Sequence, residues 1–475
     1  MSVLTTRRPR RKVWILVLAL YLATLATDVA RKVFGFPAGT LGIVYVLVGA
    51  IYLLSLRGIG SRLRASPGPL PIWLALLSIW CVIEAVIPRV PVGMAVLGWS
   101  SYVFFVPLLY VGAELMSDDR RAASALRVVA VAGAGVGLGA VASALLGQSA
   151  PVLLQPIVPS VGIHTFDTAS IYLAPSIFAT AEEAAEALLI ALFAWIALAH
   201  LPVGRLSRTS SVVIGVLIAT GLIAAERRAD LVVAVAGVIV LLLVRPVKAT
   251  RIAGRPAFWT ATLARGRLGP ALILGAIGMI ALVSFLGASR LVPFLTSASN
   301  GQDALTLMFS PSHPSALSGQ GTGTSTQGAS LVGATSFVGL AKDGQYAGYV
   351  LDGRTFVVAE GGLTKTWLEL GIMGVILYGG VFFSVLAPAI GSLRRTDGVG
   401  RALTILAVTL GIVFIKGHQS LDDPLIQPFF WLAAGGAWGR LRAPFRQWPD
   451  DAENSSPTVS WGNSLRQSAA GSRAG

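Results

Sequence analysis

Several features that mark common protein classes are scarce or absent in this sequence. It holds a single cysteine, Cys81, so no disulfide can form within the chain. Only 12% of its residues are charged, whereas soluble domains carry about 25%. It has no glycine-rich phosphate loop, nucleotide-binding fold or catalytic-serine motif, which argues against an ATP-driven enzyme or one that uses sugar nucleotides.

The four histidines, His164, His200, His313 and His418, are scattered and show no spacing typical of metal ligands. We therefore predict neither a metal site nor a cofactor. His164 and His313 remain candidates for a general base or a sugar contact.

Apolar residues are abundant instead. They make up 54% of the 475 residues, and the mean hydropathy is +0.74. Runs long enough to cross a bilayer predict an all-α polytopic membrane protein. About twelve spans are expected, at 13–30, 40–56, 70–87, 92–114, 124–146, 182–201, 211–225, 229–245, 269–288, 362–389, 401–416 and 424–440.

The basic residues predict the orientation of these spans. With the N-terminus inside, most of the 37 lysines and arginines fall on the cytoplasmic side, as in other membrane proteins. The net charge of +15 is then a topology signal and an attraction to anionic lipid, and nucleic acid is not an expected partner. The predicted order is a basic cytoplasmic N-terminus (1–12), nine spans (13–288), a large outward loop (289–361), three spans (362–441) and a disordered cytoplasmic tail (442–475).

The loop 289–361 is the longest connection, and it places the working face outside the membrane. Loops of this length are usually functional or disordered. Its uncharged middle, 304–341, is rich in glycine, serine and threonine and is predicted to be mobile.

Two arginines mark a second outward connection, Glu226-Arg227-Arg228-Ala229-Asp230. Guanidinium groups bind phosphate oxygens in bidentate geometry, so Arg227 and Arg228 could hold the diphosphate of a membrane lipid. A salt-bridge cluster with Glu226 and Asp230 is the alternative.

A third group of candidates lies where the long loop meets the next span: Glu360, Lys365, Trp367 and Glu369. Lys365 and Glu369 are four residues apart and should share a helix face. Glu369 should lie about two turns deep, while Glu360 at the mouth could act as a general base. For Glu369 a structural ion pair and a functional role stay equally open.

Acidic residues also fall within predicted spans, at Asp28, Glu84 and Glu186. Because unpaired charges in a bilayer are expensive, basic partners such as Arg31, Lys32 or Arg89 are expected. Glu84 and Glu186 could instead line a cavity or a proton path.

The layout of spans and loop resembles the O-antigen ligase and O-antigen polymerase superfamily of membrane glycosyltransferases. Two motifs carry the resemblance. Ala224-Ala225-Glu226-Arg227-Arg228-Ala229 resembles the family's Ser-Arg-Gly-Ala segment, which puts the family arginine on Arg227. The stretch from Glu360 to Gly374 resembles the family's His-Asn-…-Leu-x-Glu-x-Gly-x-x-Gly segment, with matches at Glu369, Gly371 and Gly374.

The resemblance implies metal-independent, inverting glycosyl transfer at the outer face of a bacterial cytoplasmic membrane. The donor would be a glycan on polyprenyl diphosphate, such as undecaprenyl diphosphate, and the acceptor a hydroxyl of a glycan or glycolipid. The family's catalytic histidine falls on Glu360, so either Glu360 or His313 would take the acceptor proton. Glu369 and Lys365 would position these groups, with Trp367 and His164 as further substrate contacts. A transporter or flippase of lipid-linked glycans is the alternative.

Overall fold

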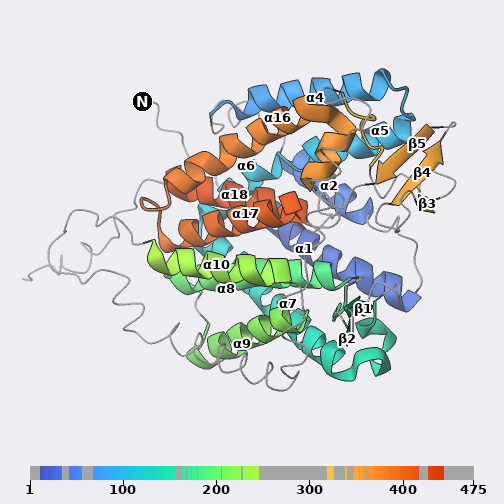
Figure 1. Ribbon diagram of the computed structural model, residues 1–475. Helices are drawn as coiled ribbons and strands as arrows, with labels where there is room; N and C mark the ends of the chain where they lie inside the picture. The colour runs from blue at the N-terminus through green and yellow to red at the C-terminus, as the bar shows by residue number, and fades with distance from the viewer. Residues whose placement is uncertain are drawn as a thin grey trace, which may run out of the picture. The chain divides into compact units, whose positions relative to one another are not determined.

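The computed structural model of the chain is mainly helical (Figure 1). It divides into two units, Met1–Leu441 and Arg442–Gly475, and the elements below belong to the first apart from the last residue of α18. The described residues are 11–34, 42–55, 68–156, 163–166, 169–172, 174–178, 180–204, 206–225, 228–244, 318–325, 337–339, 347–351, 354–358, 362–416 and 426–442.

Helices coincide with the predicted spans wherever the structure describes them, and only span 269–288 lies outside the described residues. Span 92–114 is a broken run made of α5, the π-helix η2 and α6. The elements are α1 (Arg11–Phe34), α2 (Gly42–Ser55), α4 (Leu70–Val86), α5 (Val92–Trp99), η2 (Ser100–Phe104), α6 (Leu108–Met116), α7 (Asp119–Leu146), α8 (Ala181–His200), α9 (Arg208–Ala224), α10 (Arg228–Leu243), α16 (Gly362–Gly391), α17 (Gly398–Lys416) and α18 (Ile426–Arg442).

Five helical stretches within the described residues are long and apolar enough to cross a membrane. They are Val92–Met116, Asp119–Ser149, Ala181–His200, Gly362–Gly391 and Gly398–Ile415, and several shorter helices are also apolar. These helices make the chain a candidate membrane protein. The twelve spans, the cytoplasmic termini and the outward loop go beyond this finding and stay predictions.

The starts of three helices follow from local capping. The side chain of Asp118 accepts the N–H groups of Arg120 and Arg121 ahead of α7, and Ser207 accepts that of Ser210 ahead of α9. Thr180 and Glu183 form a reciprocal capping box at α8. These side chains replace the hydrogen bonds that the first turn of a helix lacks.

Two small antiparallel sheets were not predicted. β1 (Ile163–Phe166) pairs with β2 (Ala169–Tyr172), while β3 (Phe337–Gly339), β4 (Ala347–Leu351) and β5 (Arg354–Val358) form a second sheet in that order. The first sheet lies in the connection between the predicted spans 124–146 and 182–201, and the second lies in the predicted outward loop 289–361. The all-α prediction therefore describes the helices well but misses local strand pairing between them.

Helix α7 packs on α8 and α9, and α16 packs on α4 and α17 (Figure 1). Glycine allows close approach at α7: a Cβ atom on Gly137 would lie 2.1 Å from the carbonyl oxygen of Leu217 in α9. Small residues at such crossings are typical of helix packing in membranes, where van der Waals contact replaces the hydrophobic driving force.

A similar close contact joins α6 and α18, and we call it the seam. A Cβ on Gly112 would lie 2.1 Å from the Leu432 carbonyl oxygen, and one on Gly435 would lie 1.8 Å from the Leu109 carbonyl oxygen. Both segments are helical there, so at these glycines the contact is close packing of one backbone on the other.

Segments assigned to the cytoplasmic side contact one another at one end of the helices. Arg440 at the end of α18 pairs with Asp119 at 2.6 Å and with Asp397 at 3.3 Å. Arg401 donates to the carbonyl oxygen of Val244 at the end of α10. The predicted topology requires these segments to lie together, while the side on which they lie stays a prediction.

The expected partner of Asp28 is confirmed. Arg31 pairs with it at 2.9 Å, one turn along α1. Lys32 instead donates to the carbonyl oxygens of Leu153 and Ser176. Among the described residues Glu84 and Arg89 form no ion pair, because Glu84 is buried at 2% exposure and Arg89 lies exposed in the turn after α4.

Candidate functional site

Helix α16 is interrupted at Gly371, whose φ of 65° and ψ of −167° are not helical. An L-residue with a side chain rarely adopts a positive φ, whereas glycine does so without steric cost. A helical hydrogen-bond ladder cannot run through such a residue. The carbonyl groups in the turn before Gly371 therefore need other donors.

Those donors come from a distant piece of the chain, Ser318–Ser325, which we call the inserted segment. The N–H of Gln320 donates to the carbonyl oxygen of Leu368 at 2.7 Å, and that of Gly321 donates to Glu369 at 3.2 Å. The indole N–H of Trp80 in α4 donates to the carbonyl oxygen of Leu370 at 2.8 Å. The break in α16 and the inserted segment thus complete each other's backbone hydrogen bonds.

The carboxylate of Glu369 holds the inserted segment from the side. Its Oε2 accepts the N–H of Gly323 and the hydroxyl of Tyr102, both at 3.0 Å, and its Oε1 accepts the N–H of Ser325 at 2.9 Å. Glu369 has no exposed surface. A buried carboxylate must be paired or hydrogen-bonded, and here three donors converge on it.

Helices α4 and α5 contact the opposite side of the inserted segment. The N–H of Thr322 donates to the carbonyl oxygen of Glu84, and its hydroxyl donates to that of Cys81 at 2.7 Å. A Cβ on Gly323 would lie 2.0 Å from the Met94 carbonyl oxygen, so only glycine fits. Residues 321–325 are buried as a result.

Tyr102 reaches Glu369 from a π-helical turn. Such turns displace side chains from the ordinary helical register and often occur at functional sites. Pro107 follows shortly and lacks an N–H, which further interrupts the ladder. Gln427 of α18 donates to the carbonyl oxygen of Ser101 at 2.6 Å and so ties this turn to the bundle.

The prediction that 304–341 is mobile is wrong for the inserted segment. The composition is polar and rich in glycine, which normally indicates a solvated loop. Here the polar backbone is buried against other polar backbone, so hydropathy carries no signal of it. Non-helical backbone at this depth is tolerated only where protein satisfies its hydrogen bonds, and that condition is met.

The prediction that Lys365 and Glu369 share a helix face is confirmed. Lys365 Nζ lies 4.0 Å from Glu369 Oε1, and it also lies 6.0 Å from the centre of the Tyr102 ring. Lys365 is only 3% exposed, and Trp367 is half-buried on the same stretch of α16. The contacts of Glu369 are those of a residue that holds other parts in place, which is one of the two roles left open for it.

The other predicted site residues are not placed in detail. Glu226, Arg227, His313 and Glu360 lie outside the described residues. Arg228 begins α10, and His164 lies in β1 opposite Ile171, but the description does not extend to their side chains. Whether these residues meet Lys365 and Glu369 stays a prediction.

Sequence reasoning missed Tyr102 and the inserted segment itself. The alternation of Gly319, Gly321 and Gly323 was a usable signal, because a regular run of glycines permits close backbone approach. A Cβ on Gly319 would lie 2.1 Å from the carbonyl carbon of Glu369. No pattern in the sequence alone joins Tyr102 to Glu369, which are 267 residues apart.

The described arrangement is a buried polar centre with two carboxylates, one ammonium group and several backbone donors. The second carboxylate is that of Glu84, which hydrogen-bonds the backbone of Gly319. Among the described residues no group of three or more His, Cys, Asp or Glu could hold a metal ion. A scan against protein-family models finds no match, and no curated protein matches the chain. The resemblance to the O-antigen ligase and polymerase superfamily therefore stays a prediction from the layout of spans and from short motifs.

Proposed function

We propose that this protein is a membrane glycosyltransferase of the O-antigen ligase or polymerase type. It would act at the outer face of a bacterial cytoplasmic membrane, on a glycan carried by polyprenyl diphosphate. One observation carries the proposal. The motif residues Glu369 and Gly371 are those that fasten part of the longest predicted outward loop between the helices.

This observation gives the motif a physical purpose. The carboxylate of Glu369 binds the inserted segment, and the break at Gly371 frees the carbonyl groups that bind it too. A loop fixed in this way is a suitable base for a substrate site, since catalytic groups must be held within fractions of an ångström. His313 precedes the inserted segment by only five residues in the sequence.

In the proposed reaction the acceptor hydroxyl oxygen attacks the anomeric carbon of the donor sugar. The bond from that carbon to the diphosphate breaks, with inversion, and the acceptor proton passes to Glu360 or His313. Arg227, aided by Arg228, stabilises the charge on the departing diphosphate. Lys365 and Glu369 act as positioning residues, and Trp367 and His164 contact the sugars.

The test uses the purified protein in lipid with a polyprenyl-diphosphate glycan as donor and an acceptor glycan. Arg227→Ala should abolish product at normal protein level, whereas the exposed Arg208 of α9 serves as a matched control in Arg208→Ala. Full activity of Arg227→Ala would refute the diphosphate site. Loss of activity in Glu360→Gln with normal turnover in His313→Ala would identify the base, and the reverse result would assign it to His313.

A transporter or flippase is the second candidate, and one finding favours it. Discontinuous helices that line a polar centre are common in transporters, and α16 is broken at Gly371 beside the buried Glu369 and Lys365. The same reconstituted protein separates the two functions. A transporter moves the labelled lipid-linked glycan across the bilayer unchanged, whereas a glycosyltransferase lengthens it or transfers it.

A further inference from the structure

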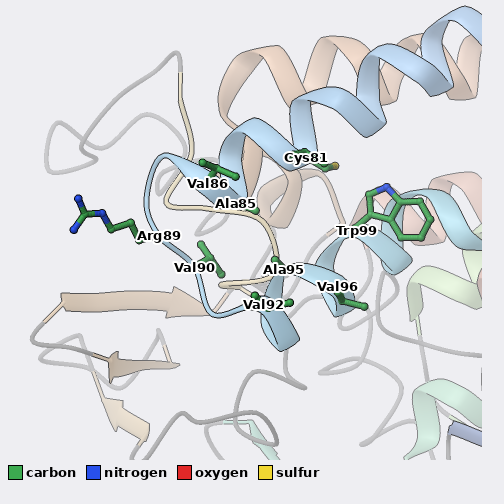
Figure 2. Close-up of a pocket in the computed structure, with 10 residues that line it drawn as sticks. Cys81, Ala85, Val86, Arg89, Val90, Val92, Ala95, Val96 and Trp99 are labelled. Atoms are coloured by element: carbon green, nitrogen blue, oxygen red, sulfur yellow. The ribbon is translucent and has the colours of Figure 1, made fainter.

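A groove between α4 and α5 adjoins the inserted segment: Cys81 and Val90 line the groove, and the same two residues lie against Thr322 and Gly321. Its volume is about 390 Å³, at the low end of the 300–1,000 Å³ usual for ligand sites. Valines supply much of its lining, and Trp99 closes its far end (Figure 2). Val82, Val86, Val92 and Val96 are all more than half exposed.

The groove runs from the turn between the two helices along their length. Val82 and Val86 are one helical turn apart on α4, as are Val92 and Val96 on α5. From Cys81 to Val86, where α4 ends, the wall extends about 7.5 Å at about 1.5 Å per residue, and the turn with Arg89 continues it. A narrow apolar channel of this form, on helices predicted to span the bilayer, fits a hydrocarbon chain.

Among the described residues that line the groove, one is charged, and it stands at the mouth. Arg89 lies in the turn after α4 with a φ of 56°, and its side chain points away from the valines (Figure 2). Arg89 is exposed and makes no ion pair with any described residue. The turn joins two predicted spans, so Arg89 is expected at the level of the lipid headgroups.

We propose that this groove binds an anionic phospholipid, with one acyl chain between α4 and α5 and its phosphate on Arg89. The guanidinium group binds phosphate in bidentate geometry, and the absence of an acidic side chain from the described lining leaves its charge free for that phosphate. The proposal does not depend on glycosyl transfer. It concerns a lipid that stays bound while the protein works.

The strained backbone at Arg89 offers a clean variant. Asparagine adopts a positive φ more readily than most residues, so Arg89→Asn removes the charge without adding strain. Arg89→Lys keeps the charge but loses the bidentate geometry. Ala95→Trp fills the groove with an indole and leaves Arg89 in place, and Ile79→Trp on the exposed side of α4 is the matched control for added bulk.

The experiment is native mass spectrometry of the full chain with two probes of equal chain length, phosphatidylglycerol and phosphatidylcholine. Wild-type protein should retain the anionic lipid about tenfold better. Arg89→Asn should abolish that preference, and Arg89→Lys should restore part of it. Ala95→Trp should lower retention of both lipids, while Ile79→Trp changes neither.

Equal retention of the two lipids by wild-type protein would overturn the proposal. So would an unchanged preference in Arg89→Asn, or tighter retention of a single-chain prenyl phosphate than of phosphatidylglycerol. Size-exclusion profiles show whether each variant is folded. If Arg89→Asn fails to fold, lipid retention by Ala95→Trp is compared with that by Ile79→Trp. Equal retention by those two variants would also refute lipid binding in the groove.

Discussion

The inserted segment and the seam between α6 and α18 solve the same packing problem by different means. In both, glycine lets two backbones approach so closely that a Cβ would lie about 2 Å from a carbonyl oxygen. At the seam both segments are helical, so at its glycines the contact is close packing of one backbone on the other. The inserted segment has no helix of its own and depends on donors and acceptors supplied by its neighbours.

The two contacts differ in how many groups contribute to the free energy that stabilises them. Many side chains share the packing at the seam, so no single polar group decides it. In the polar centre a few hydrogen-bonded groups contribute most of the stabilising free energy, because a buried donor or acceptor that loses its partner costs about 1–3 kcal/mol. Four variants, with two further variants for comparison, test this contrast, using the thermal stability of the whole protein and hydrogen exchange of the 318–325 amides as separate measurements.

Glu369→Ala should have the largest effect. It leaves the N–H groups of Gly323 and Ser325 without their acceptor and removes the carboxylate 4.0 Å from Lys365. Breaking a buried pair on one side costs about 3–5 kcal/mol. We expect the amides of 318–325 to lose protection from exchange. Glu369→Gln keeps one acceptor and should lose less, and unchanged protection in Glu369→Ala would contradict the assigned hydrogen bonds.

A matched pair of glycine variants should have the next largest effects, at different places. Gly323→Ala meets the Met94 carbonyl oxygen and has a φ of 86°, so overpacking of about 1–3 kcal/mol adds to backbone strain of about 1–2 kcal/mol. In Gly323→Ala the amides of 318–325 should lose protection from hydrogen exchange, while the melting temperature of the protein changes little. Gly435→Ala should lower the melting temperature and leave 318–325 protected. The same response in both variants would mean that the two regions unfold together.

Tyr102→Phe should have the smallest effect. It removes one donor to Glu369 but leaves both backbone donors in place, so the loss is about 1.5 kcal/mol. Exchange at 318–325 should rise by about tenfold. The control is Tyr378→Phe, whose ring packs edge-on against Tyr102 at 5.2 Å but whose hydroxyl takes no part in these hydrogen bonds. An equal effect of the two variants would show that the loss is not specific to the hydrogen bond between Tyr102 and Glu369.

The helices could be predicted because long apolar runs are visible in the hydropathy of the sequence. The shared helix face of Lys365 and Glu369 could be predicted too, since residues four apart lie side by side on a helix. Burial of the inserted segment could not, because its own hydrogen-bonding groups are mostly backbone N–H groups, which every sequence contains, and their acceptors lie far away in the sequence. The break at Gly371 belongs to the same class: glycine permits a positive φ there, but only the opposing donors make it favourable.

The hydrogen bond between Tyr102 and Glu369 also sets an order in time. The two residues are 267 positions apart, and ribosomes add about 5–20 residues per second. Tyr102 and α4 must therefore wait on the order of tens of seconds in the membrane before their partner helix is made. The inserted segment, synthesised in between, has no acceptor at Glu369 until then. The polar centre is thus among the last parts of this protein to form, and a chain that ends before α16 should never form it.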